Sequence, residues 1–192
     1  METTLSTLGH STHPLPHVLA LLTQHGITAV ADVRSMPYSR RAPQWNRESL
    51  RAALAPRHIA SVHGGELGAR PDTPTCYVAG RVQYARLAAT TAFQHGLARR
   101  QRGLQRSRIA LRCAEQEPLA CHRTLLIGHA LHGPELAIQH ILADGRLEAH
   151  AASAQRLVHR VGEVTDAPQA LEWVDEVQGH RIASTRYVIS SW

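Results

Sequence analysis

The sequence predicts a single three-layer α/β domain with a mostly parallel sheet of about five strands and helices on both faces. Short apolar runs of strand length alternate along the chain with segments whose apolar residues follow helical spacing. The first of these runs are apolar throughout, which is typical of parallel strands buried on both faces. A chain of 192 residues is also long enough for one well-buried domain.

Each expected element has a local signal in the sequence. The expected strands cover residues 3–8, 27–33, 59–62, 109–111 and 136–142. One helix begins at residue 15 and is ended by Gly26, and a second follows Asn46 and is stopped by Pro56. Further helices are expected at 82–101, around 125–131 and at 147–161, with a turn at Asp144 and Gly145 before the last of them.

Two segments are expected along the chain. Residues 1–161 carry the alternating pattern and should form the α/β domain. The periodic signals weaken in residues 162–192, where a helix near 168–177 and a strand-like segment at 182–189 are the best interpretation. We expect this segment to be a C-terminal extension packed on the same domain.

The charge of the chain comes from arginine alone. All 21 Lys or Arg positions are Arg, the formal net charge is +6 and the isoelectric point is about 10.0. Guanidinium groups suit phosphate and carboxylate recognition. A genome that uses Arg in place of Lys is the simpler explanation, because excess charge alone indicates solubility and nonspecific attraction.

The sequence also predicts the protein's surroundings. The three cysteines are an odd number, which argues against a disulfide framework. No N-terminal segment has the order of a signal peptide, and no apolar stretch approaches the roughly 20 residues that cross a bilayer. We therefore expect a cytoplasmic protein with no membrane partner, and a homodimer stays open.

Polar side chains follow the expected strands at the point where each strand ends. These residues are His10 and Ser11, Asp32 and Arg34, His63 and Glu66, and Cys113 and Glu115. The carboxyl ends of parallel strands meet at one edge of the sheet, and α/β sheets bind ligands there. The sequence therefore predicts a functional site at this edge.

The segment 108–131 is the richest in reactive groups. Cys121 comes where a helix should begin, so free amide groups, the helix dipole and Arg123 or a charged His122 all favour its thiolate. This suits a nucleophile, although a small buried residue is an equal alternative. We expect Cys113, at the end of a buried strand, to belong to the core.

The other candidates have paired interpretations. Glu115 is either a general acid or base or the ion-pair partner of an arginine. Arg34 and Arg123 either bind a phosphate or carboxylate or tie loops together, and Asp32 is more simply an anchor for such an arginine. Cys113 and Cys121 lie eight positions apart, which is no standard zinc spacing, so we expect no metal ion and no cofactor.

Several short motifs occur together in order along the chain. They are Thr7–Ser11, Asp32–Arg34 with Pro37 behind it, Gly65–Gly68, Cys113–Glu115 and Cys121–Arg123. With this set the chain resembles the bacterial family called domain of unknown function 488, from about residue 3 to about residue 160. The resemblance implies a compact α/β domain and marks these loops, but it supplies no reaction.

Three functions remain open, and whether the chain is an enzyme at all is one of the questions. The first is an enzyme for an anionic substrate that bears phosphate, such as a nucleotide or nucleic acid. Catalysis would rest on Cys121, Glu115 and His10, and binding would use Ser11, Asp32, Arg34, Glu66, His122 and Arg123. The alternatives are a nucleic-acid-binding module without chemistry and a protein for sulfur transfer or redox chemistry through Cys121.

Overall fold

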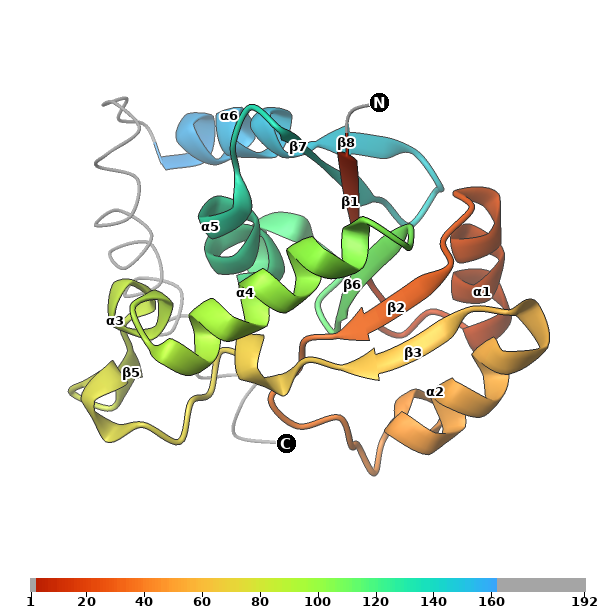
Figure 1. The fold of residues 1–192 in the computed structure, drawn as a ribbon, viewed down its shortest axis with the longest axis horizontal. Coiled ribbons are helices and arrows are strands. Elements are labelled where there is room, and N and C mark those ends of the chain that lie inside the picture. The colour runs from red at the N-terminus through yellow and green to blue at the C-terminus, as the bar shows by residue number, and fades with distance from the viewer. Residues whose placement is uncertain (1–2, 162–192) are drawn as a thin grey trace.

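The computed structural model describes residues 3–161, which form a three-layer α/β domain around a six-stranded sheet (Figure 1). The strands of the sheet are β1 (Thr3–Gly9), β2 (Ala29–Asp32), β3 (Ala60–His63), β6 (Ile109–Cys113), β7 (Leu136–Ile141) and β8 (Leu147–Ala149). Their spatial order is β3-β2-β6-β1-β7-β8, and every neighbouring pair is parallel except β7 and β8. A separate antiparallel ribbon pairs β4 (Tyr77–Val78) with β5 (Arg81–Val82).

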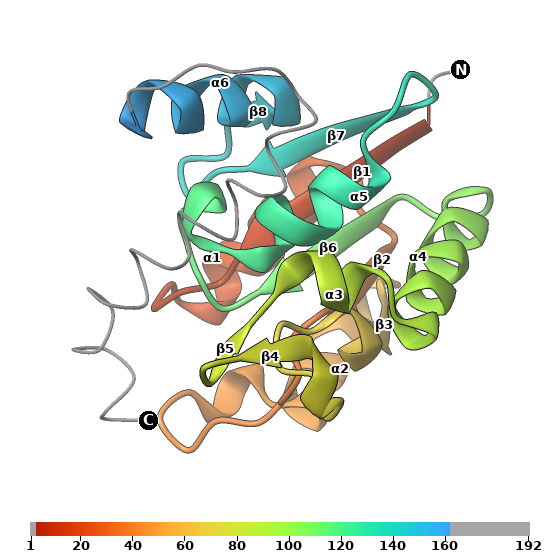
Figure 2. The same cartoon turned by 90° about the vertical axis from the view of Figure 1, so that its left-hand side faces the viewer.

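Helices cover both faces of this sheet. One face is covered by α1 (Leu15–Gln24) and α2 (Arg47–Leu54), and the other by α4 (Thr91–Leu104) and a π-helical segment Arg123–Gly128 that continues into α5 (His129–Leu131). The remaining helices are α3 (Tyr84–Ala88) and α6 (His150–Val161). Figure 2 shows α6 at the β8 end of the sheet and α2 near the opposite end. Short 3₁₀ helices cover Pro43–Trp45, Ala55–Arg57, Gly65–Leu67, Pro74–Cys76 and Pro118–Ala120.

The central strands β1, β2 and β6 are buried on both faces, as the continuous apolar runs predict. In β1, Leu5 packs into the core under α4 and α5, whereas Leu8 packs into the core under α1 and α2. The same division separates Leu111 from Ala110 in β6. Successive side chains of a strand point to opposite faces, so one uninterrupted apolar run supplies two cores.

The sequence predicted the five parallel strands but not all of the remaining elements. The helix expected at 82–101 is two helices, because the Thr90 hydroxyl accepts a hydrogen bond from the Phe93 amide and starts α4 anew. The helix expected at 147–161 begins three residues later, at α6. Residues Leu147–Ala149 instead form β8, which the turn at Asp144 and Gly145 folds back onto β7.

The topology marks one position at the carboxyl edge of the sheet. The segment that follows β6 packs on the face of the sheet covered by α4 and α5. The segments that follow its neighbours β1 and β2 pack on the face covered by α1 and α2. Such a point, where connections leave in opposite directions, is where open α/β sheets bind ligands. The loop after β6 therefore lies at the place where a site is expected.

The C-terminal extension at 162–192, with its helix and strand-like segment, lies outside the described residues. Within residues 3–161, no helix combines the length and apolar character needed to cross a bilayer.

Candidate functional site

Four chemically reactive side chains meet where β6 ends. Cys113 is the last residue of β6, Glu115 lies in the following loop, and Cys121 and His122 directly precede the π-helical segment. Their donor atoms, two Sγ, one carboxylate oxygen and the Nδ1 of His122, all lie within 4.8 Å of one another. We call these four residues the Cys–Glu–His cluster.

The contacts within the Cys–Glu–His cluster are close. The Oε2 atom of Glu115 lies 2.8 Å from the sulfur of Cys113 and 3.1 Å from the sulfur of Cys121. The Nδ1 atom of His122 lies 3.7 and 3.8 Å from the same two sulfur atoms. Both cysteines and His122 are buried, whereas Glu115 is exposed as a residue although its carboxylate reaches the buried sulfurs.

Local structure explains why the two cysteines meet despite their separation in sequence. Pro118 starts a 3₁₀ turn in which Glu117 accepts a hydrogen bond from the Leu119 amide, and this turn brings the chain back toward β6. The carbonyl of Cys121 then accepts the amides of Thr124 and Leu125, each at 3.1 Å. Cys121 therefore stands at the start of a helical segment, which confirms its expected position.

The orientation of His122 is fixed by a bond outside the cluster. Its Nε2 atom lies 3.0 Å from the carbonyl oxygen of Val33, at the end of β2. A carbonyl only accepts, so Nε2 carries the proton. In the neutral ring Nδ1 therefore has the free lone pair, and this lone pair is directed to the two sulfur atoms.

Arg123 holds the loop in place from the inside. It is fully buried, and its guanidinium donates to the carbonyl oxygens of Glu115 and Gln116 and, at 3.3 Å, to the hydroxyl of Thr7. Its backbone amide also donates to the sulfur of Cys121 at 3.4 Å. These contacts match the loop-tying interpretation of Arg123, because its guanidinium is engaged by the protein's own oxygens.

Glycine is required where this loop crosses the end of β1. A Cβ atom at Gly9 would overlap the carbonyl oxygen of Glu115 and lie 2.9 Å from the Cα of Gln116. The amide of Ser11 donates to the carbonyl of Ala114 at 2.8 Å, which continues the contact beyond the strand. The strands β1 and β6, which are the first and fourth of the expected strands, therefore end side by side, as predicted.

The two thiols have different acidities. The hydrogen bond with Cys121, and then burial, raise the pKa of Cys113 well above its usual value. Burial alone would raise the pKa of Cys121 as well, but the hydrogen bond from Cys113 and the positive charges of Arg123 and His122 lower it well below its usual value. Cys121 is therefore the more acidic thiol of the pair.

The pKa values of Glu115 and His122 also depend on Cys121. Burial of the carboxylate and the negative charge of Cys121 raise the pKa of Glu115. Burial would lower the pKa of His122, but the charge and hydrogen bond of Cys121 outweigh it and raise this pKa. The pKa values of Glu115 and His122 are thus both raised by their proximity to Cys121.

A second network lies beside the cluster at the ends of β2 and β6. The carboxylate of Asp32 accepts Arg34 at 2.8 Å and Arg112 at 2.6 Å, and both guanidinium groups also donate to the carbonyl of Trp45. Burial would raise the pKa of Asp32, but the hydrogen bond from Arg34 and the charge of Arg112 lower it. Asp32 is thus an anchor, as its simpler interpretation predicted, and Arg34 is engaged with it.

The other expected site residues do not enter the cluster. His10 is buried, its Nδ1 lies 2.6 Å from the carbonyl of Cys113, and its ring contacts Trp45. Burial and the charge of Arg112 lower its pKa to about 3, so it is neutral. Glu66 forms ion pairs with Arg99 and Arg100, and α4 carries both of these arginines.

Sequence reasoning therefore found most of this site and missed one member. Cys121, Glu115 and His122 are brought together. His10, Ser11 and Arg123 bond to backbone carbonyls of the segment 113–116. Asp32 and Arg34 form a separate ion pair. Cys113 was expected in the core, and it is buried as expected, but its sulfur is part of the cluster. Its position two residues before Glu115, at a strand end, was the available signal.

Comparison with known proteins gives one result. The family model described as "Domain of unknown function DUF488" matches residues 14–130, which include all four cluster residues. No significantly similar protein was found among the curated proteins or among the solved structures. The resemblance seen in the motifs is thereby confirmed over more than half of the chain, and the protein belongs to the DUF488 family.

Proposed function

We propose that the Cys–Glu–His cluster binds one divalent transition-metal ion of the zinc class and that this ion is the protein's reactive centre. The observation that carries the proposal is the convergence of four donor atoms within 4.8 Å. Thiolate sulfur, imidazole nitrogen and carboxylate oxygen are the ligands that zinc uses in proteins. The proposal replaces the expectation of a metal-free site, which rested on spacing along the chain.

The distances support a tetrahedral ion. With bonds of about 2.3 Å to sulfur and about 2.0 Å to nitrogen, tetrahedral ligand atoms lie about 3.5 Å apart. The two distances from His122 Nδ1 to sulfur, 3.7 and 3.8 Å, are close to this value. The Oε2 atom of Glu115 is nearer to the sulfurs, at 2.8 and 3.1 Å, so it would move outward by about half an ångström on binding.

The surroundings of the ligands also suit a metal. Imidazole ligands usually donate their second ring N–H to an oxygen that fixes their orientation. His122 has this arrangement with the carbonyl of Val33. The amide of Arg123 directed at Cys121 adds a donor to a sulfur that would carry negative charge.

The ligands differ in their access to solvent, and this difference points to catalysis. Cys113, Cys121 and His122 are buried, and Glu115 is the one of the four residues with exposed surface, although its carboxylate is partly buried against the two sulfurs. Catalytic zinc sites keep three protein ligands and leave the fourth position to water or substrate. Glu115 is therefore the ligand that water would displace, and its carboxylate would remain close enough to accept the proton of that water.

A cobalt titration of the purified full chain tests the proposal. We expect one equivalent of Co²⁺ to produce the visible and sulfur charge-transfer absorption of a tetrahedral thiolate site. Cys113→Ser and Cys121→Ser variants should lose this absorption, and Cys76→Ser is the matched control because Cys76 is an equally buried cysteine outside the cluster. Absence of the absorption in the unaltered chain, or its persistence in both cluster variants, would overturn the proposal.

A second candidate function rests on the two sulfur atoms alone. They lie within 4.8 Å of each other, so mild oxidation of the two thiols is a reasonable reaction. An added oxidant such as diamide would accept two electrons and two protons, and a Cys113–Cys121 disulfide would form. If the chain forms this disulfide rapidly and does not bind Co²⁺, redox chemistry is favoured over the metal centre.

A further inference from the structure

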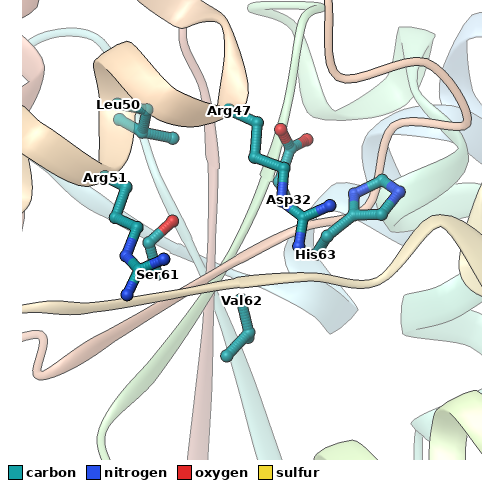
Figure 3. A pocket seen from close by; sticks show the side chains of 7 residues that line it. All are labelled: Asp32, Arg47, Leu50, Arg51, Ser61, Val62 and His63. Carbon is teal, nitrogen blue, oxygen red and sulfur yellow. The ribbon is translucent and has the colours of Figure 1, made fainter.

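A small polar pocket lies between α2 and β3, at the carboxyl ends of β2 and β3. It is lined by Asp32, Arg47, Leu50, Arg51, Ser61, Val62 and His63 (Figure 3). Figure 3 shows Arg47 and Arg51 extending from α2 toward β3, where Ser61 and His63 lie. The Cys–Glu–His cluster contributes no residue to this pocket, so an inference about the pocket does not depend on the metal.

We infer that this pocket binds the terminal phosphate group of an anionic ligand. Its volume is about 40 Å³. One water needs about 10–15 Å³ on such a measure, so the pocket accommodates a group of a few atoms and not a whole nucleotide. The remainder of a bound molecule would extend into solvent.

The two guanidinium groups carry the charge argument. Arg47 and Arg51 lie one helical turn apart on α2 and are exposed. Like charges at this spacing repel each other. Within residues 3–161 neither side chain forms an ion pair with a carboxylate, and the nearby Glu48 accepts the hydroxyl of Tyr38. An oxyanion between them would turn this repulsion into two charge-assisted contacts.

The acidic residue in the pocket does not oppose an anion. Asp32 is the one carboxylate among the lining residues, and Arg34 and Arg112 contact it at 2.8 and 2.6 Å. Its charge is therefore balanced from the side of the sheet, which leaves the charges of Arg47 and Arg51 in excess on the solvent side.

The remaining polar groups are suited to hydrogen bonding with phosphate oxygens. Ser61 contributes a hydroxyl from β3. His63 contributes an imidazole, whose Nδ1 atom is buried and has no hydrogen-bond partner within the described residues. A buried nitrogen without a partner is unusual, and it leaves a hydrogen-bonding group beside the pocket that no described protein group uses.

This assignment changes which residues recognise the anion. The sequence pointed to Arg34 and Arg123, but both are buried and engaged by oxygen atoms of the protein itself. Arg47 and Arg51, by contrast, are exposed and line this pocket together. The inference thus keeps the expected anionic ligand but assigns its recognition to Arg47 and Arg51.

Titration of the full chain with inorganic phosphate, followed by two-dimensional NMR at constant ionic strength, tests the inference. We expect saturable shifts at residues 47–51 and 61–63, and at least about tenfold weaker binding in an R47A/R51A variant. Arg57→Ala is the matched control, because Arg57 is an exposed arginine just after α2 and lies outside the pocket. It should bind phosphate like the unaltered chain.

Three outcomes would overturn the inference. One is the absence of saturable shifts at these residues, and another is equal binding by R47A/R51A and the unaltered chain. The third is equal weakening by R47A/R51A and Arg57→Ala, which would indicate nonspecific attraction to a basic surface. Acetate in place of phosphate distinguishes a general carboxylate site from a phosphate site. Loss of cobalt binding would leave all of these results unchanged, so the two proposals fail separately.

Discussion

His122 hydrogen-bonds through Nε2 to the carbonyl oxygen of Val33, 89 residues earlier in the chain, and thereby directs its Nδ1 to the sulfurs of Cys113 and Cys121. The bond joins the end of β2 to the loop after β6. It converts a flexible imidazole into a group of fixed orientation and tautomer, which is what a metal site needs from a ligand.

Replacement of this imidazole should therefore reduce metal affinity more than it reduces stability. We expect His122→Ala to weaken Zn²⁺ binding beyond the roughly 100-fold that outer-shell changes produce. Competition with a chromophoric chelator measures this change. His129→Ala, which alters a half-buried histidine on α5 outside the cluster, should leave the affinity unchanged.

Replacement of the exposed ligand should have a milder effect. Glu115→Gln keeps the shape of the side chain but weakens its oxygen as a ligand, and the three buried ligands remain. We expect the Co²⁺ complex to form with about tenfold lower affinity and an altered visible spectrum, because water takes the fourth position. An unaltered spectrum would show that Glu115 is not a ligand.

The crossing of β1 by the Glu115 loop should be sensitive to one added methyl group. Gly9→Ala would place a Cβ atom against the carbonyl of Glu115, and overpacking of this kind costs about 1–3 kcal/mol of unfolding free energy. Denaturant unfolding measures this loss. Gly133→Ala is the control, because a Cβ at Gly133 meets no heavy atom of residues 3–161 within 4 Å.

The buried ion network should depend strongly on its single carboxylate. Asp32→Asn would leave the guanidinium groups of Arg34 and Arg112 without a counter-charge, and breaking a buried pair in this way costs about 3–5 kcal/mol. Asp144→Asn removes the partner of Arg146 at the surface, where water solvates both groups, so the stability should stay nearly unchanged. Equal unfolding midpoints for the two variants would contradict this account of Asp32.

Two buried histidines should make the protein less stable in acid. His140 contacts the hydroxyl of Thr7 at 2.7 Å and His150 at 3.2 Å. Burial and the charge of His150 lower the pKa of His140 to about 3, and burial and the charge of His132 lower that of His150 to about 4. Both rings are neutral in the folded chain at pH 5 and become charged on unfolding.

The sign of the pH dependence follows from these lowered values. Below the unfolded value of about 6.5 the unfolded chain binds more protons, so stability is complete above pH 6.5 and falls as the pH drops toward 3. Each histidine adds a slope of up to about 1.4 kcal/mol per pH unit. Denaturant unfolding with a chelator present measures this slope. A His140→Gln variant should lower the slope by up to about 1.4 kcal/mol per pH unit, which corresponds to one proton.

The sequence predicted the sheet because each central strand is buried on both faces, as with the alternation of Leu5 and Leu8 between two cores. It did not predict β8, since Leu147–Ala149 is short and reads as the start of α6 until β7 is present to pair with it. It also missed the break at Thr90, whose side chain starts α4 within the single helix expected at 82–101.

The site shows the same division between local and long-range information. The position of Cys121 at a helix start is local, and the sequence predicted it. The inclusion of Cys113 depends on the return of the chain through the Pro118 turn, and the orientation of His122 depends on a carbonyl of β2. Whether an arginine is exposed or engaged, as for Arg51 and Arg123, also depends on contacts with distant segments.

X-ray absorption at the zinc edge of the reconstituted full chain tests the central claim most directly. The account predicts one zinc per chain, with two sulfur ligands at about 2.3 Å and two nitrogen or oxygen ligands at about 2.0 Å. Cys113→Ser and Cys121→Ser should each remove one sulfur from this shell or abolish binding. A shell of oxygen and nitrogen atoms alone, or a chain that retains no zinc after dialysis, would contradict the proposed metal centre.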